Sequence, residues 1–519
     1  MKTTFACFLL ACISIFSISF IQAQSPKKTA KSITPESIIN HISVLANDSM
    51  LGRKTPGPEL EKSAQYIAAQ FKNFGLEPVN GSYFQPVYLS KCRLGNNNSV
   101  IITRGNTKYN LEIKKDFIPF ESSANISVDA QLVFAGYGIT APEYNYDDYA
   151  NIDVQGKIVL ILDHEPGEED IMSVFDGAML SEYGKHATKL KNAIEHGAGG
   201  LILITDPLNH LLIKPIGSPW PSLSKIIPDD AIPTKLVKNN KDNSIPFVHM
   251  GKKMISLVFE DIDSLKNIQK AIDESLVPNS FSIPGIKINI RTNIEKNITE
   301  VKNVVGFLKG SSAELSDEVV VIGAHYDHIG YKKKVQPGVD SIFNGADDNA
   351  SGTSGMLNVA EAFSKMNIMP KRSILFIAFT GEEIGLFGSQ YYTANPLFPI
   401  EKTVVMLNLD MIGRNARDTL QLHEAKEQQE IVSIIQEQNK ILKTKLKLVE
   451  QGHSGGSDHA PFIEAGVPSI FFFTGLHKDY HAVSDQVELI DSIKAANVAR
   501  LCFGTAWHIA NDNSYYKSK

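Results

Sequence analysis

Residues 318–330 read EVVVIGAHYDHIG, an apolar run that stops at a histidine and an aspartate. Such an uninterrupted run is typical of a strand covered on both faces of a sheet. His325 and Asp327 stand two residues apart, so on an extended segment their side chains point to the same side. That pattern suits a histidine metal ligand with a carboxylate that orients it. A single H-x-D pair is weak evidence, and His328 in the same motif is set aside.

Three further apolar runs end in the same manner. They are RSILFIAFTGEE at 372–383, TVVMLNLD at 403–410 and PSIFFFT at 468–474. The side chains that follow them are Glu382, Glu383, Asp410 and, after a short loop, His481. Strands alternating with helical segments predict an α/β domain, and ligands of open α/β sheets gather beyond the carboxyl ends of the strands. Four runs ending in metal-type side chains therefore indicate a site.

The stretch NGADDNASG, residues 344–352, places Asp347 and Asp348 side by side. It fits a surface turn, the start of a calcium loop, or part of a metal site. A calcium loop starting at Asp347 needs a glutamate at its twelfth position, where this chain has Asn358, so calcium is rejected. Two histidines and three carboxylates, one of them shared, can hold two zinc ions.

The chain has 519 residues and a net charge of −6, with no basic cluster, so a nucleic-acid partner is not expected. An apolar run follows the first residues and precedes Ala23, which predicts a secretory signal over 1–23 and an exported protein. Two alternatives leave the chain anchored to a membrane, namely an uncleaved signal or lipidation at Cys12. No later segment is apolar enough to span a bilayer.

Changes in composition and periodicity along the chain predict its domains. Residues 24–36 are polar and are expected to form a flexible leader. The segment 37–95 contains a helical pattern with Gly75 as its end, and 96–290 is rich in short β-type runs without a catalytic constellation. The α/β alternation occupies 291–519. Cys92 and Cys502, which follow the signal, are either paired or two buried thiols.

Five motifs together resemble those of the co-catalytic di-zinc exopeptidases, which include secreted leucyl-type aminopeptidases, glutamate carboxypeptidase and the transferrin-receptor ectodomain. The motifs are GAHYDHIG, NGADDNASG, FTGEEIGLFGS, LNLDMIGR and HKDYHAVSD, in this order. The resemblance covers about 300–510, and 37–80 resembles the N-terminal helix of the family. It implies a mixed, mainly parallel sheet between helices. The segment 96–290 is similar to the protease-associated domain often inserted in this family.

The resemblance also implies roles for individual residues. One zinc would be bound by His325 and Asp410, and the other by Glu383 and His481. Asp347 would bridge the two ions, and a cis peptide is expected between Asp347 and Asp348. Glu382 would be the general base, Asp327 would support His325, and Tyr480 would stabilise the oxyanion.

The expected activity is removal of N-terminal residues from peptides or proteins by a water that bridges the two zinc ions. A carboxypeptidase is the alternative, and it would need an arginine such as Arg414 to grip a terminal carboxylate. Glutaminyl cyclisation and a metal-free, receptor-like binding ectodomain are further alternatives, although every ligand position is filled here. Side-chain preference and oligomeric state are left open.

Overall fold

A computed structural model describes residues 25–175, 177, 179–218, 220, 232–237, 244–333, 336–514 and 516. The predicted signal sequence lies outside these residues. The chain divides into two compact units. We name them the split unit, formed by residues up to Val87 and from Val301 onward, and the inserted unit, Tyr88–Glu300. Compared with the predicted 96–290, the inserted unit also contains parts of the strands β1 (Phe84–Leu94) and β13 (Ile294–Leu308), which run between the two units in the sequence.

The split unit is built on a mixed sheet. Its strand order is β1 (Phe84–Leu94), β13 (Ile294–Leu308), β15 (Ser373–Phe379), β14 (Val319–His325), β16 (Thr403–Leu409), β19 (Ser469–Phe473), β17 (Thr419–His423) and β18 (Lys447–Glu450). The central pairs β15–β14, β14–β16 and β16–β19 are parallel. The pairs β13–β15 and β17–β19 are antiparallel. This order confirms the predicted mixed, mainly parallel sheet.

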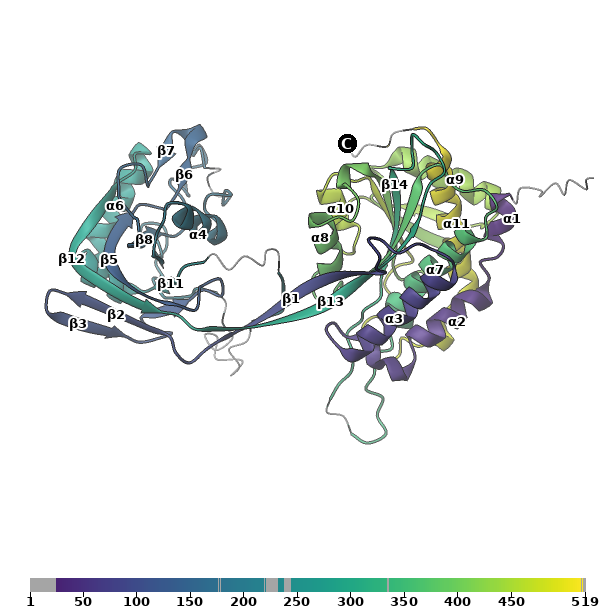
Figure 1. Cartoon of the computed structure of the whole chain (residues 1–519), viewed down its shortest axis with the longest axis horizontal. Coiled ribbons are helices and arrows are strands. Elements are labelled where there is room, and N and C mark those ends of the chain that lie inside the picture. The colour runs from purple at the N-terminus through teal and green to yellow at the C-terminus, as the bar shows by residue number, and fades with distance from the viewer. Residues whose placement is uncertain are drawn as a thin grey trace, which may run out of the picture. The chain divides into compact units, whose positions relative to one another are not determined.

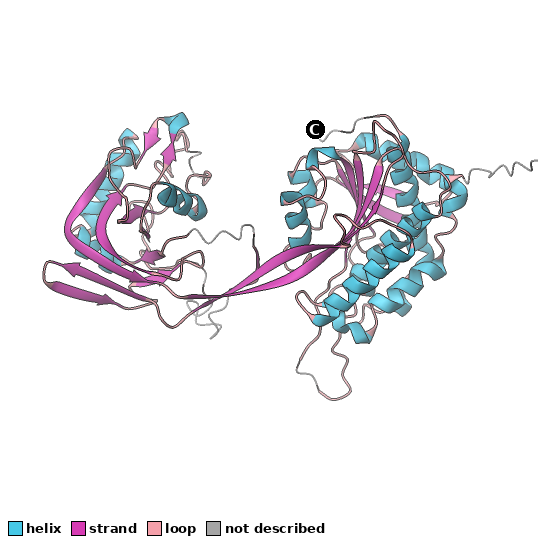
Figure 2. Cartoon of the chain, in the orientation of Figure 1, coloured by secondary structure: helices cyan, strands magenta, loops and turns pink. Residues whose placement is uncertain are grey.

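Helices cover both faces of this sheet (Figures 1 and 2). On one side α7 (Gly352–Ser364) packs against β14 and against α11 (Ser492–Asn511), which also contacts α2 (Pro35–Leu45) and α9 (Gln429–Leu442). On the other side α8 (Phe387–Ala394) contacts β15 and α10 (Ala460–Glu464). Every residue of β14, β15 and β16 is buried, as their apolar sequences predict. No helix among the described residues is long and apolar enough to cross a membrane.

The N-terminal segment follows one prediction and corrects another. The helical pattern after residue 57 forms α3 (Pro58–Asn73), which buries Leu60, Ala64, Ile67, Ala68 and Phe71. Gly75, at φ +78°, follows its end. The prediction of a flexible leader over 24–36 is wrong for the described part, because Pro26–Ala30 forms the short helix α1, which packs on α11. Thr29, Ala30 and Ile33 are buried there, so apolar contacts hold this polar-looking segment in place.

The inserted unit has a sheet of its own. The strand order is β3 (Thr107–Leu111), β2 (Ser99–Arg104), β12 (Ser280–Arg291), β5 (Ser127–Ala135), β8 (Ile158–Leu162), β9 (Gly200–Ile204), β11 (Phe247–Met250) and β4 (Phe117–Pro119). The strands β5, β8, β9 and β11 are mutually parallel. The described residues of the unit also form the α-helices α4 (His186–Glu195), α5 (Lys252–Val258) and α6 (Ile262–Ser275) and the short strand pair β6 (Thr140–Ala141) and β7 (Tyr146–Asp147). The strand β10 (Lys235–Leu236) pairs with β1.

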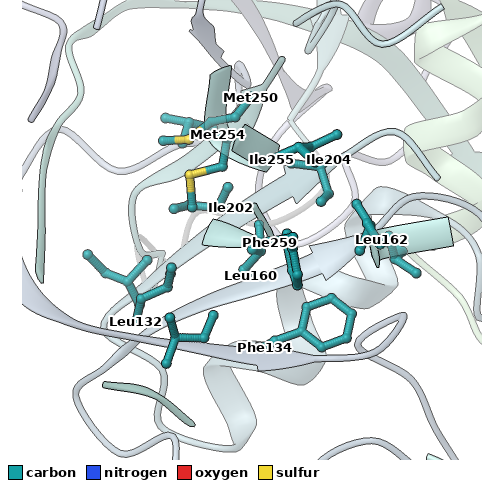
Figure 3. Close-up of a cluster of buried hydrophobic side chains, with 14 of the residues drawn as sticks. Leu132, Phe134, Leu160, Leu162, Ile202, Ile204, Met250, Met254, Ile255 and Phe259 are labelled. Atoms are coloured by element: carbon teal, nitrogen blue, oxygen red, sulfur yellow. The ribbon is translucent and has the colours of Figure 1, made fainter. Parts of the chain in front are cut away.

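Alternate side chains of the parallel strands fill two cores in the inserted unit. On one face Leu160 of β8 and Ile202 of β9 meet Met254 and Phe259 from the segment around α5 (Figure 3). The opposite face holds Ile161 and Leu203, among others. Cys92 and Cys502 are both free and buried.

We expect Phe376→Ala to destabilise the split unit. The ring is fully buried in β15, with ring centroids 6.2 Å from Phe71 and 6.0 Å from Phe363. Its truncation should lower the free energy of unfolding by about 3–5 kcal/mol, because transfer and cavity terms add. Urea denaturation followed by circular dichroism measures the change. Ile368→Ala, at a side chain that is 47% exposed, is the control and should change stability by less than about 0.5 kcal/mol. Equal losses would contradict this packing.

Candidate active site

The candidate site lies where the parallel strands of the split unit end. His325 is the last residue of β14 and pairs in register with Phe379, the last residue of β15. Glu382 follows β15 after a short turn, and Asp410 follows β16 directly. Parallel pairing of these three strands brings side chains together that are up to 85 positions apart in the sequence, at one edge of the sheet.

The first group of possible metal ligands is His325, Glu382 and Asp410. The His325 Nε2 atom lies 3.4 Å from Asp410 Oδ1 and 3.9 Å from Glu382 Oε2. Asp410 Oδ2 accepts a hydrogen bond from the Ser457 hydroxyl at 2.8 Å, which fixes the carboxylate. Its other oxygen therefore faces the histidine, as a metal ligand should.

The second group is Asp348, Glu383, His481 and His328. The His481 Nε2 atom is 3.0 Å from Glu383 Oε2 and 3.2 Å from Asp348 Oδ2. His328 Nδ1 is 2.6 Å from Glu383 Oε1. The sequence predicts no role for His328 in metal binding. The structure corrects this expectation, because the His328 ring is buried against Glu383 of the second group.

Asp348, and not Asp347, joins the two groups. Its Oδ1 atom is 3.4 Å from His325 Nε2, while its Oδ2 atom is 3.2 Å from His481 Nε2. One carboxylate thus presents an oxygen to each histidine, which is the geometry of a ligand shared by two metal ions. The expectation that Asp347 joins the two groups is wrong by one position in the sequence.

Asp347 points away from both groups. Its Oδ1 accepts a hydrogen bond from the Gly413 backbone N–H at 2.7 Å, and its Oδ2 lies 3.3 Å from His477 Nε2. The physical reason is that neighbouring side chains in this turn face opposite ways, so only one of two adjacent acids can enter the site. The cis peptide joins Asp348 to Asn349 and not Asp347 to Asp348.

Asp327 lies beside His325 on the side away from the candidate ligands. Its Oδ1 is 3.7 Å from His325 Nδ1 and accepts the Glu382 backbone N–H at 3.2 Å. The other oxygen accepts the Thr55 hydroxyl at 2.8 Å. This placement agrees with the expected supporting role, since a carboxylate behind a ligating histidine fixes the ring.

Tyr480 stands at the open side of the site. Its ring stacks on His481, with centroids 3.9 Å apart, and its side chain is 39% exposed. The Asp348 and Glu383 carboxylates lie near enough to add to burial in raising the pKa of this phenol. The hydroxyl therefore stays protonated at neutral pH and is able to donate a hydrogen bond.

Burial and neighbouring charges raise the pKa values of some groups in the site and lower those of others. Burial raises the pKa of Glu382 well above its usual value, and the Asp410 and Asp458 carboxylates raise it further. Burial also acts on Asp348, but the histidines around it outweigh that effect and hold its pKa well below the usual value. Close contact with the Asp348 and Glu383 carboxylates raises the pKa of His481 to about 10.

The side chains present fit a pair of divalent ions. Asp410 Oδ1 and His481 Nε2 are buried, and neither has a hydrogen-bond partner among the described residues. Both point into the groups that contain them. Imidazole nitrogens and carboxylate oxygens are ligands that zinc prefers, and four carboxylates balance the charge of two dications.

Sequence reasoning missed the residues that hold the ligands in place. Asp485 accepts the backbone N–H groups of both Asp347 and Asp348. Arg53, fully buried, donates to the backbone oxygens of Asn344 and Gly345, at 2.7 and 3.0 Å. The sequence gives no signal for Arg53, which is distant in the chain.

The sequence of this chain matches the model of peptidase family M28 over residues 303–506. A glutamate carboxypeptidase 2 homolog of Caenorhabditis briggsae is 24% identical over 538 residues, covering 88% of this chain and 64% of its own length. Aminopeptidase YwaD of Bacillus subtilis is 27% identical over 276 residues, covering 49% of this chain and 52% of its own length. The chain thus spans between half and two thirds of these curated relatives.

Among solved structures, an aminopeptidase from Aneurinibacillus sp. strain AM-1 aligns with 95% of this chain and 98% of its own, at 21% identity and a TM-score of 0.46. A likeness of that size adds nothing to what the strand order already shows. The family match, in contrast, spans every strand end that carries a candidate ligand. The segment that matches the model of peptidase family M28, residues 303–506, therefore contains the whole candidate site of the split unit.

Proposed function

We propose that this protein is a zinc-dependent exopeptidase that removes residues from the N-terminus of peptides. The observation that carries the proposal is the position of Asp348, whose two oxygens face His325 and His481 beside the half-buried Glu382. Two zinc ions, when bound, would polarise the scissile carbonyl and lower the pKa of the attacking water. The relatives named as aminopeptidases support this reading.

The ligands divide between two positions in this proposal. His325 and Asp410 would hold one ion, Glu383 and His481 would hold the other, and Asp348 would be shared. His328, hydrogen-bonded to Glu383, orients that ligand. Asp327 keeps the His325 ring in place from behind.

Glu382 is the proposed general base. It accepts the proton of the attacking water and returns it to the leaving amine. A metal pair beside it would offset the burial that raises its pKa, so that it is ionised at neutral pH. Tyr480 would donate a hydrogen bond to the oxygen that becomes negatively charged as the carbonyl is attacked.

The arginines of the split unit favour an aminopeptidase over the carboxypeptidase alternative. Arg414 pairs with Asp479 and lies 3.6 Å from Asp485, so its charge is already balanced. Arg372 pairs with Glu318, and Arg417 pairs with Asp491. Arg53 and Arg500 donate to backbone carbonyls. A substrate carboxylate would have to compete with these partners, whereas a substrate ammonium would meet a site rich in carboxylates. The relatives named as glutamate carboxypeptidase homologs are the reason to test the carboxypeptidase alternative by experiment.

One peptide in three forms, free, N-acetylated and C-amidated, tests which end of the substrate the enzyme requires to be free. We expect N-acetylation to abolish hydrolysis and C-amidation to leave kcat/KM within a factor of about three, because the proposed site binds the free amine. Release of the terminal residue is followed by mass spectrometry. The opposite pattern would establish the carboxypeptidase.

Glu382→Gln should separate metal binding from turnover. The amide cannot act as a base, so kcat should fall by about 10²–10⁴, while metal analysis should still find the zinc of the parent protein. Glu401→Gln, at an exposed glutamate outside the site, is the matched control and should change neither quantity. Unchanged kcat in Glu382→Gln would remove this residue from the role.

A pair of adjacent substitutions tests which aspartate is shared. Asp348→Asn should lose at least one equivalent of zinc and nearly all activity, because an amide is a poor ligand between two cations. Asp347→Asn should retain its zinc, since its carboxylate contacts Gly413 and His477 instead. Plasma emission spectrometry measures the metal content of both. If the two results were exchanged, Asp347 would be the shared ligand.

A further inference from the structure

The inserted unit contains a second set of metal-type side chains at strand ends. His164 and Asp206 come shortly after β8 and β9, which are neighbouring parallel strands in register from Ile158 to Leu162. Glu168 follows His164 by four positions, and His210 follows Asp206 by four positions. The sequence shows no catalytic constellation between 96 and 290 and gives no signal for this cluster, because only the strand pairing brings the two separate loops together.

The four side chains converge on one point. His164 Nδ1 is 2.6 Å from Asp206 Oδ1, and His210 Nε2 is 2.9 Å from Glu168 Oε2. The crossed separations are also short, since Glu168 Oε2 lies 3.8 Å from His164 Nδ1 and Asp206 Oδ2 lies 3.8 Å from His210 Nε2. One donor atom from each of the four lies within 4.8 Å of the others.

Neighbouring groups hold this cluster in position. Asp206 is fully buried, and its Oδ2 accepts a hydrogen bond from Gln269 Nε2 at 3.3 Å. Gln269 is itself fixed, because its oxygen accepts the Leu208 backbone N–H at 2.8 Å. A ligating carboxylate that is itself held by a hydrogen bond is typical of metal sites.

The cluster opens onto a cavity of about 640 Å³ within the inserted unit. His164 and His210 line it, with side chains 26% and 36% exposed. His186, which pairs with Asp163 at 2.8 Å, and His249 also line it. An ion therefore has a path to the four donors from solvent.

Two separate ion pairs do not account well for this arrangement. Two neutral imidazoles could each donate one N–H, from His164 to Asp206 and from His210 to Glu168, and these two hydrogen bonds would account for the 2.6 and 2.9 Å contacts. They do not account for the approach of each carboxylate to within 3.8 Å of the other ring, nor for the stacking of the two rings with centroids 4.1 Å apart and an interplanar angle of 19°. One dication among the four donor atoms would attract all four side chains. Two nitrogen and two carboxylate donors suit zinc, whereas calcium and magnesium prefer oxygen ligands alone.

We propose that His164, Glu168, Asp206 and His210 form a zinc site of the inserted unit. The ion would tie the loop after β8 to the loop after β9 and would lie in the wall of the cavity. This site does not depend on the proposed exopeptidase function, and either proposal can fail without the other.

The test is zinc binding to the full chain, stripped of metal, in a background that weakens the strand-end site of the split unit. Zn²⁺ alone is titrated into His325→Ala/His481→Ala and into the same protein with His164→Ala/His210→Ala added. Equilibrium dialysis with metal analysis should find one equivalent fewer in the second protein. His186→Ala in the same background is the matched control and should keep the full count, since His186 lines the cavity outside the cluster.

A second measurement protects the test against misfolding. Zn²⁺ should raise the melting temperature of the protein with an intact cluster by more than that of the protein lacking His164 and His210, because the ion binds the folded state. Glu168→Gln, a milder change, should weaken zinc binding at least tenfold while keeping the circular dichroism of the parent. Equal zinc counts with and without the two histidines, or Ca²⁺ binding as tight as Zn²⁺ at this cluster, would overturn the proposal.

Discussion

The split unit depends on four carboxylates gathered at one edge of its sheet, of which Asp348 and Asp410 are buried and Glu382 and Glu383 are half-buried. Carboxylates gathered in a region of low polarity repel one another and lose hydration, so such a cluster requires compensating positive charge. Among the described residues, no lysine or arginine side chain forms an ion pair with any of the four. Their ion-pair contacts are with histidines. Metal ions between the histidines and carboxylates are the simplest compensation.

The turn that carries Asp348 is held from three sides. Arg53 binds the carbonyls that precede it, and Asp485 takes the N–H of Asp348. The Asn349 side chain binds the carbonyl of Leu409, one residue before Asp410. Neighbouring strand ends are therefore linked by the same turn that supplies the shared ligand, and the distance between the two groups does not rest on side-chain packing alone. Preorganisation of this kind keeps ligands in place before any ion binds.

Both units place polar side chains beyond the carboxyl ends of parallel strands. In the split unit β14, β15 and β16 carry the candidate active site, and in the inserted unit β8 and β9 carry the proposed zinc site. The cause is shared, because parallel pairing aligns the ends of strands that are far apart in sequence and leaves a crevice outside them. The difference lies in burial: His325, Asp348 and Asp410 of the first site are buried, while the second site lies in the wall of an open cavity.

The sequence by itself determined the buried strands and the residues that follow them. Continuous apolar runs are typical of strands covered on both faces of a sheet, so the positions of His325, Glu382 and Asp410 at strand ends were predictable. Tertiary structure decided what local pattern cannot express. Whether Asp347 or Asp348 enters the site depends on the direction of one turn, which distant contacts to Arg53 and Asp485 hold. The cluster around His164 could not be predicted, because histidines and acids in loops are common, and only the parallel register of β8 and β9 brings these four together.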